Sequence, residues 1–171
     1  MVSFSFLKGI NMENNDIKIL KDYKEYKFRV AGIVIKNNKV LICRMHYNNY
    51  YCFPGGHVEI LEDSLHAIER ELNEELYFKV NIKSLFALHE NFYENRNKKF
   101  HEICFYYLAE PVEEVLLEDR IYEEIDHGNL VKYLYKWVDR NKLKDYKLHP
   151  EIIVEKLEKN DEKFMHFITK D

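Results

Sequence analysis

The sequence contains no run of 18 consecutive apolar residues, the shortest stretch that suggests a membrane-spanning helix. The mildly apolar residues 1–7 are interrupted by Lys8 and follow no basic region, so they do not have the pattern of a secretory signal peptide. We therefore expect a cytoplasmic protein with no membrane partner.

Cysteine is scarce, and no Cys-x-x-Cys pair occurs among Cys43, Cys52 and Cys104. An odd number of widely spaced cysteines argues against a zinc ribbon and against a disulfide framework. We expect reduced and mostly buried thiols, as in cytosolic proteins. Cys52 lies three residues before the glycine pair Gly55-Gly56, so the alternative to a buried, inert thiol is a reactive role for this cysteine.

Glycine and proline are also few, with 5 and 3 residues, which excludes collagen-like and low-complexity chains. There is no basic excess either, because 26 Lys and Arg stand against 30 Asp and Glu, for a net charge of -4. Proteins that bind duplex nucleic acid normally contain a basic domain, so we expect no such partner. The chain does have 46% hydrophobic residues in 171, which suits one packed globular domain.

Apolar and β-branched segments predict strands in both halves of the chain. Residues 28–35 and 40–43 flank Asn37 and Asn38, which tolerate positive φ, and this pattern predicts a β-hairpin. The other segments expected to form strands are 50–53, 80–93, 100–109 and 133–138.

Two segments are predicted to form helices, and from Asp63 the period of the apolar residues changes from two to 3.6. The first begins after Asp63, whose carboxylate suits an N-cap. Residues 149–150, His-Pro, open the second, because proline suits the first helical position. The apolar stripe of the first helix is expected at Leu65, Ile68, Leu72 and Leu76.

This order of strands, helix, strands and helix predicts an α+β fold, in which a mixed sheet lies between two helices. We expect one domain over residues 25–158, after an N-terminal extension over 1–24. Residues 111–130 are acidic and predicted to be irregular. Residues 159–171 are predicted to be the end of the second helix or a tail.

The first predicted helix presents Glu71, Glu74 and Glu75 on one face, because residues three and four apart are neighbours on a helix. Like charges this close repel one another and raise each other's pKa values. A divalent cation would relieve the repulsion, and hard oxygen ligands suit Mg²⁺ or Mn²⁺. The alternative is a solvated, glutamate-rich helix face.

The residues of the turn before this helix favour a cation site over a solvated helix face. Gly55 and Gly56 lack a Cβ, so a backbone carbonyl at this turn could approach the same ion. Glu59 and Glu62 add acceptors on the loop, and Arg70 has the planar group that holds a carboxylate in a fixed orientation. A solvated face would not require these residue types at these spacings.

The same spacing resembles the Nudix box, and the resemblance extends more weakly over about residues 25–158. Phe53-Pro54-Gly55 and Glu59 also resemble the usual approach to the box. The chain departs from the box at Tyr77, where the family usually has a glycine that caps the helix in a left-handed conformation, and at Phe78. Tyr77 should therefore be strained, or the helix should end differently. The box positions that match are Gly56, Glu62, Arg70, Glu71, Leu72, Glu74 and Glu75.

The resemblance implies a Nudix fold and a hydrolase that cleaves a nucleoside diphosphate linked to another moiety, with Mg²⁺ or Mn²⁺ as cofactor. The implied ligands of the cation are the carbonyl of Gly55 and the carboxylates of Glu71, Glu74 and Glu75.

The resemblance also implies a catalytic group of Glu74, Glu71 and Arg70, in which Glu74 is the first choice as general base. Glu62 would support the loop and the start of the helix, paired with Arg70, and Gly56 would have a structural role. The looser candidates for the base, in the segment before the last predicted strand, are Glu123, Glu124 and Asp126.

Arg44 is the better candidate for a phosphate contact, because it ends a strand that leads toward the glycine pair. Each arginine could instead be a surface residue, and each aromatic residue could simply pack in the core. The favoured substrate is a (deoxy)nucleoside triphosphate. A dinucleoside polyphosphate, ADP-ribose or a non-catalytic nucleotide-binding module are the alternatives, and a homodimer is left open. The residues expected to contact substrate are Arg44, Arg29, His57, Phe53 and Glu59.

Overall fold

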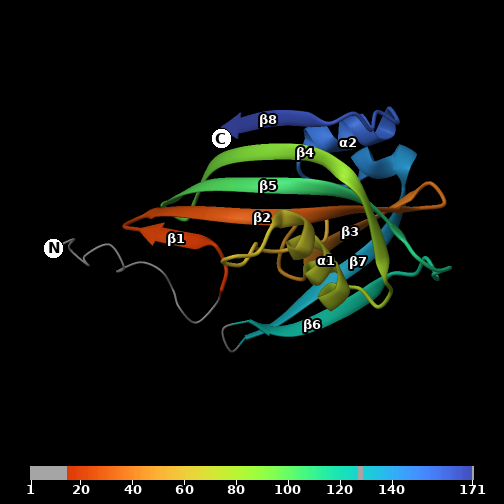
Figure 1. Ribbon diagram of the computed structural model, residues 1–171, viewed down its shortest axis with the longest axis horizontal. Coiled ribbons are helices and arrows are strands. Elements are labelled where there is room, and N and C mark those ends of the chain that lie inside the picture. Colours follow the sequence, from red (N-terminus) through yellow and green to blue (C-terminus); the bar gives the residue numbers. More distant parts are fainter. Residues whose placement is uncertain (1–14, 127–128, 171) are drawn as a thin grey trace.

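The computed structural model describes residues 15–126 and 129–170, which form one mixed sheet with a helix on each face (Figure 1). The strand order is β6-β7-β3-β2-β5-β4-β8, with β1 paired to β2 outside this path. The pairs β2–β5 and β4–β8 are parallel and the other pairs are antiparallel. The elements in chain order are β1 (Lys18–Lys21), β2 (Lys24–Lys36), β3 (Lys39–Met45), α1 (Ser64–Glu75), β4 (Val80–Asn95), β5 (Lys98–Pro111), β6 (Arg120–Asp126), β7 (Asn129–Asp139), a 3₁₀ helix (Arg140–Asp145), α2 (Glu151–Glu158) and β8 (Met165–Lys170).

Two separate hydrophobic cores hold the two helices against the sheet. Ile68 and Leu72 of α1 belong to one core, and Ile153 and Leu157 of α2 belong to the other. The predicted α+β sandwich of helix, mixed sheet and helix is therefore confirmed. No helix within the described residues has the length and apolar character needed to span a bilayer.

The predicted hairpin and first helix are present. Asn37 and Asn38 join β2 to β3 with φ angles of 49° and 61°, as a tight hairpin turn requires. Asp63 caps α1, because its side chain accepts hydrogen bonds from the backbone N–H groups of Leu65 and His66. Leu65 is exposed, so the buried stripe of α1 begins one turn later than predicted.

Two predictions for the connections are wrong. Residues 50–53 form no strand, since Cys52 and Tyr51 each make only an isolated bridge. The acidic segment 111–130 is not irregular throughout, because Arg120–Asp126 forms β6 against β7. An ion pair between Glu123 and Lys132 on the neighbouring strand compensates an acidic side chain of β6.

The sheet extends beyond the predicted domain at both ends of the chain. Strand β1, in the predicted extension, pairs with β2. Within residues 159–171, predicted to be a helix end or tail, strand β8 forms and runs parallel to β4. Phe167 of β8 is buried between the exposed His166 and Ile168, which is the period-two pattern of a strand with one covered face.

Candidate active site

The loop that contains the glycine pair lies directly against β2. The backbone N–H of Gly32 donates to Pro54 at 2.8 Å, and that of Val30 donates to Gly56 at 3.0 Å. Val58 completes the attachment by donating to Phe28 at 3.0 Å. These bonds hold the glycine backbone beside α1, which packs on the same strand.

Both glycines lie in close contact with neighbouring groups. Gly55 has φ +139°, and a Cβ there would lie 2.3 Å from the carbonyl oxygen of Val30. A Cβ on Gly56 would lie 2.4 Å from the carboxyl oxygens of Glu71. Gly55 therefore lets the loop lie against the backbone of β2, and Gly56 leaves space for the Glu71 carboxyl group in its present position.

Arg70 links the loop to the acidic helix face. Its Nε and Nη2 donate to the two carboxylate oxygens of Glu62, both at 2.9 Å, and Nη2 also donates to the His57 carbonyl at 3.0 Å. Its Nη1 donates to Glu71 at 3.0 Å and to Glu74 at 3.5 Å. This arrangement holds the pKa of Glu62 below its usual value, chiefly through the hydrogen bonds from Arg70.

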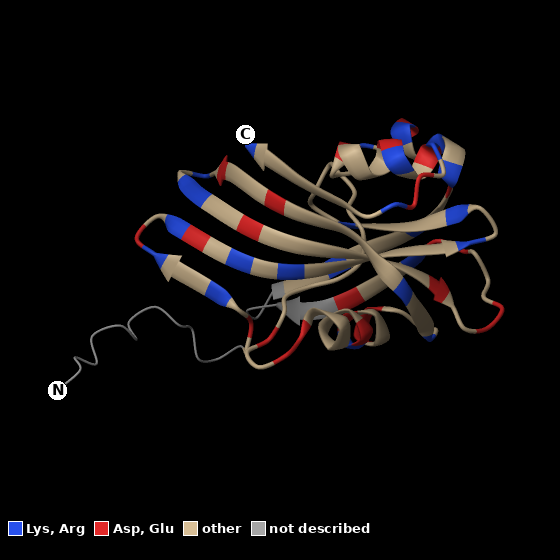
Figure 2. Cartoon of the chain, turned by 45° about the horizontal axis from the view of Figure 1, so that its top comes forward, with Lys and Arg blue, Asp and Glu red and all other residues tan. Residues whose placement is uncertain are grey.

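The carboxyl groups of Glu71 and Glu75 have raised pKa values. Burial raises the pKa of Glu71. Burial, with the like charge of Glu71, raises the pKa of Glu75 to about 8, although the Gly55 N–H donates to Glu75 Oε2 at 3.0 Å. Glu74 is exposed to solvent. Figure 2 shows the concentration of acidic residues along the loop before α1 and on the helix itself.

The three carboxylates do not converge on one point. Among residues 15–126 and 129–170, no group of three His, Cys, Asp or Glu side chains is arranged to hold a metal ion. The reason is that Glu71 and Glu74 turn to Arg70, whereas Glu75 turns to Gly55. The set of donors still fits a hard divalent cation, because carboxylate and carbonyl oxygens suit it and a positive charge would relieve the repulsion that raises the pKa of Glu75.

Of the two arginines expected to contact substrate, only Arg29 lies at the glycine turn. Its Nη2 donates to the Gly55 carbonyl at 3.4 Å, its Nη1 is 3.9 Å from Glu102, and its buried Nε makes no hydrogen bond. The guanidinium of Arg44 instead donates to the Asn48 carbonyl at 2.9 Å and stacks on the Tyr51 ring.

The other expected contact residues have different surroundings. His57 Nδ1 lies 3.6 Å from Asp16, and burial, with the nearby charge of Arg29, lowers the pKa of His57 to about 3. Glu59 is half-buried and accepts a weak hydrogen bond of 3.5 Å from Asn15.

Phe53, also predicted to contact substrate, is 3% exposed and packs edge-on against Tyr106 in the core. Of the looser candidates for the base, Glu123 pairs with Lys132. The side chains of Glu124 and Asp126 lie outside the part of the chain that the structure describes.

Sequence reasoning missed Glu102 beside Arg29 and Asp16 beside His57. Glu102 pairs in register with Lys27 across β2 and β5, so it points to the same face of the sheet as Arg29. Alternation within each strand was visible in the sequence, but the register between two strands whose paired residues lie 75 positions apart was not.

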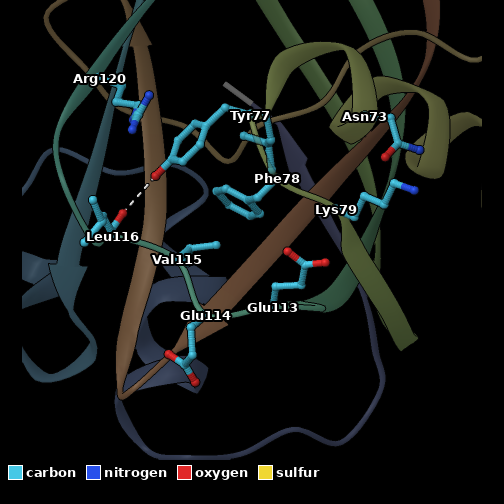
Figure 3. Close-up of a pocket in the computed structure, with 10 residues that line it drawn as sticks. Asn73, Tyr77, Phe78, Lys79, Glu113, Glu114, Val115, Leu116 and Arg120 are labelled. Carbon is cyan, nitrogen blue, oxygen red and sulfur yellow. Dashed lines mark hydrogen bonds between the residues drawn. The ribbon is translucent and has the colours of Figure 1, made fainter.

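The helix end at Tyr77, where the family usually has a glycine, needs no left-handed residue. Leu76 ends α1 in an extended conformation, with φ -101° and ψ 142°, so no left-handed cap is needed. The Tyr77 hydroxyl donates to the Leu116 carbonyl at 2.8 Å, and Arg120 stacks on the ring (Figure 3). The Tyr77 side chain thus joins the end of α1 to the β5–β6 connection. Tyr77 and Phe78, whose rings are in contact, both line a cavity of about 790 Å³.

Comparison with known proteins identifies the family. The NUDIX domain matches residues 26–157 of the chain. The chain belongs to the Nudix family. The "8-oxo-dGTP diphosphatase" of Buchnera aphidicola is 31% identical over 124 residues, which are 70% of this chain and 82% of that protein. This Nudix protein is therefore a pyrophosphohydrolase of the Nudix type.

A second curated relative supports the family, and a solved structure supports the fold. The "ADP-ribose pyrophosphatase" of Methanocaldococcus jannaschii is 28% identical over 104 residues, which are 59% of this chain and 60% of that protein. A Nudix hydrolase from Nitrosomonas europaea has the same fold, with a TM-score of 0.58 at 17% identity over 85% of this chain and 79% of its own. The two curated relatives act on different substrates by name, so the family does not determine the substrate of this enzyme.

Proposed function

We propose that this Nudix enzyme uses Mg²⁺ or Mn²⁺ to cleave the pyrophosphate bond of a (deoxy)nucleoside triphosphate. The observation that carries the proposal is the fixed contact between the glycine loop and α1, in which Arg70 joins Glu62, Glu71 and Glu74. The relative named as an 8-oxo-dGTP diphosphatase supports a nucleoside triphosphate as the substrate class.

The cation would be held by the carboxylates of Glu71, Glu74 and Glu75 with the Gly55 carbonyl. A bound divalent cation neutralises pyrophosphate charge and lowers the pKa of the attacking water. Arg70 keeps Glu71 oriented, since its guanidinium is itself fixed by Glu62.

Glu74 is proposed to accept the proton of the attacking water, because it is exposed and makes only a weak contact with Arg70. Arg29 is proposed to pair with a phosphate oxygen, because it lies at Gly55 and its Nε has no hydrogen-bond partner. Arg44 remains a proposed second phosphate contact.

Substitution of Glu74 tests this assignment. Glu74→Gln removes the base but keeps the size of the side chain, so kcat should fall at least about 100-fold with Mg²⁺ present. Glu69→Gln, an exposed position on the same helix, is the matched control and should keep the wild-type rate. Equal phosphate release by wild type and Glu74→Gln would contradict the role of Glu74.

The cation and the substrate are tested together with a nucleotide panel. Treatment with EDTA should abolish turnover, and added Mg²⁺ or Mn²⁺ should restore it. The panel should contain nucleoside triphosphates, 8-oxo-dGTP, ADP-ribose and a diadenosine polyphosphate. A higher kcat/KM for ADP-ribose would favour the second candidate, which the relative from M. jannaschii motivates.

The proposal also includes a cytoplasmic location and a homodimer. The free thiols of Cys43, Cys52 and Cys104 support a reducing compartment. Exposed Leu116 and Ile121 supply apolar surface for a second copy. Light scattering should give twice the mass of one chain, and the mass of a single chain would exclude the dimer.

A further inference from the structure

Two of the three cysteines face each other beside the acidic helix. Cys43 of β3 and Cys52 form an antiparallel bridge in which each backbone N–H donates to the carbonyl of the other at 2.8 Å. Directly opposite residues point to the same face of a sheet, and the two Sγ atoms are 3.7 Å apart. The chain thus brings together two thiols that lie nine positions apart in the sequence.

The expected Cα spacing of this pair suits a disulfide. Hydrogen-bonded antiparallel partners have Cα atoms about 5.5 Å apart, which is within the commonest spacing for disulfides. Because an S–S bond is about 2.05 Å long, the two Sγ atoms must approach by roughly 1.7 Å from their 3.7 Å separation. Because the Cβ atoms of a hydrogen-bonded antiparallel pair lie about 5.5 Å apart and a disulfide needs about 3.5–4.5 Å, rotation about the Cα–Cβ bonds is not sufficient, and Cys52 must also move toward β3.

The two thiols differ in access. Cys52 is partly exposed, whereas Cys43 is buried, so an oxidant meets Cys52 first. The hydrogen bond with the Cys43 thiol, together with the charge of Arg29, lowers the pKa of Cys52 and favours its thiolate. Cys104 is buried in the core on the other face of the sheet.

Cys52 is joined to the glycine loop by only two residues. After Phe53, Pro54 accepts a hydrogen bond from Gly32, and Gly55 donates to Glu75 at 3.0 Å. A movement of Cys52 toward β3 therefore acts on the segment that holds Gly55 against Glu75.

We propose that Cys43 and Cys52 form a reversible disulfide when the enzyme meets hydrogen peroxide, and that this bridge lowers its hydrolytic activity by displacing Gly55 from Glu75. The effect on activity rests on the proposed function, whereas formation of the bridge does not.

The chemistry balances with one peroxide. The Cys52 thiolate attacks a peroxide oxygen, the O–O bond breaks, and hydroxide leaves and takes up the thiol proton as water. The Cys43 sulfur then attacks the resulting sulfenic sulfur, so the S–S bond forms, the S–O bond breaks and a second water leaves. The two thiols lose two electrons and two protons to the peroxide, and a dithiol reductant reverses the change.

Mass spectrometry and activity of the full chain test the proposal. After treatment with a small excess of hydrogen peroxide, the peptides containing Cys43 and Cys52 should be linked, with the loss of two hydrogen atoms. The number of thiols titrated under denaturing conditions should fall from three to one. The kcat/KM should fall at least about threefold, and dithiothreitol should restore it.

Matched alanine variants separate the cysteines. Cys104→Ala should respond to peroxide as the wild type does, whereas Cys43→Ala and Cys52→Ala should form no linked peptide and keep their activity. Absence of the linked peptide from the wild type would overturn the bridge. A linked peptide with unchanged kcat/KM would overturn the effect on Glu75. If the reduced enzyme hydrolysed no nucleotide, the proposed function would fail while the peptide measurement still decided the bridge.

Discussion

At Gly56, a single hydrogen atom stands where any other residue would place a carbon against the carboxyl group of Glu71. The sequence predicted that a glycine here permits a close approach. It did not predict that Glu71 itself makes that approach, because the position of a side chain 15 residues away depends on how the loop lies on β2. The glycine therefore sets the position of the acidic helix face relative to the loop.

Gly56→Ala should displace the Glu71 carboxyl group and lower kcat/KM at least about tenfold, equivalent to about 1.4 kcal/mol of transition-state stabilisation. The helix itself should remain, because its cap and buried stripe are untouched, so the melting temperature and circular dichroism serve as controls. An unchanged kcat/KM in a normally folded variant would refute the steric argument.

Elements defined by local signals were predictable, whereas elements defined by distant partners were not. The hairpin of β2 and β3 has Asn37 and Asn38 at its turn, and α1 has Asp63 at its cap, so each was visible in a short window of sequence. Strand β6 was missed because its acidic residues are compensated by β7, as in the pair of Glu123 and Lys132. Propensity alone contains no information about such a partner.

The contact between α1 and β2 illustrates what fixes an element in place. A Cβ on Gly32 would lie 2.7 Å from Leu72 Cδ1, so this glycine lets the helix approach the strand closely. Because Leu72 is fully buried, its side chain has little space into which to move.

Gly32→Ala should lower the free energy of unfolding by about 1–3 kcal/mol through overpacking. Leu72→Val shortens the opposing side chain, so the double variant should be more stable than the sum of the two single changes predicts. Denaturant unfolding of the four proteins measures this coupling, and strict additivity would show that the two residues do not compete for the same space.

For the whole molecule, the sequence predicted the sandwich and the acidic helix face but not the limits of the sheet. The box is a local spacing, so Arg70, Glu62 and the glycine pair could be placed together from sequence alone. The burial of Phe53 depends on its packing against Tyr106, which no local pattern reveals. Strand β8 was missed because its burial depends on β4, whose paired residues lie 78 positions earlier in the chain.

Strand β8 should stabilise the complete fold through its buried face, which contains Phe167. Phe167 is 8% exposed and stacks on His89 with ring centroids 4.2 Å apart, whereas the next residue, Ile168, is 52% exposed. Phe167→Ala should lower the free energy of unfolding by about 3–5 kcal/mol. Ile168→Ala is the matched control and should change it by less than about 0.5 kcal/mol. Equal effects of the two substitutions would show that β8 does not pack as described.

The backbone at the start of the described chain is fastened to the same loop that presents the glycine pair. Ile60 donates to the Asn15 carbonyl and Ile17 donates to the Val58 carbonyl, both at 2.7 Å. A truncated or tagged form of the protein should therefore keep every residue from Asn15 onward, with a flexible spacer before Asn15. A tag attached directly to this segment would disturb the backbone bonds that hold the loop with the glycine pair.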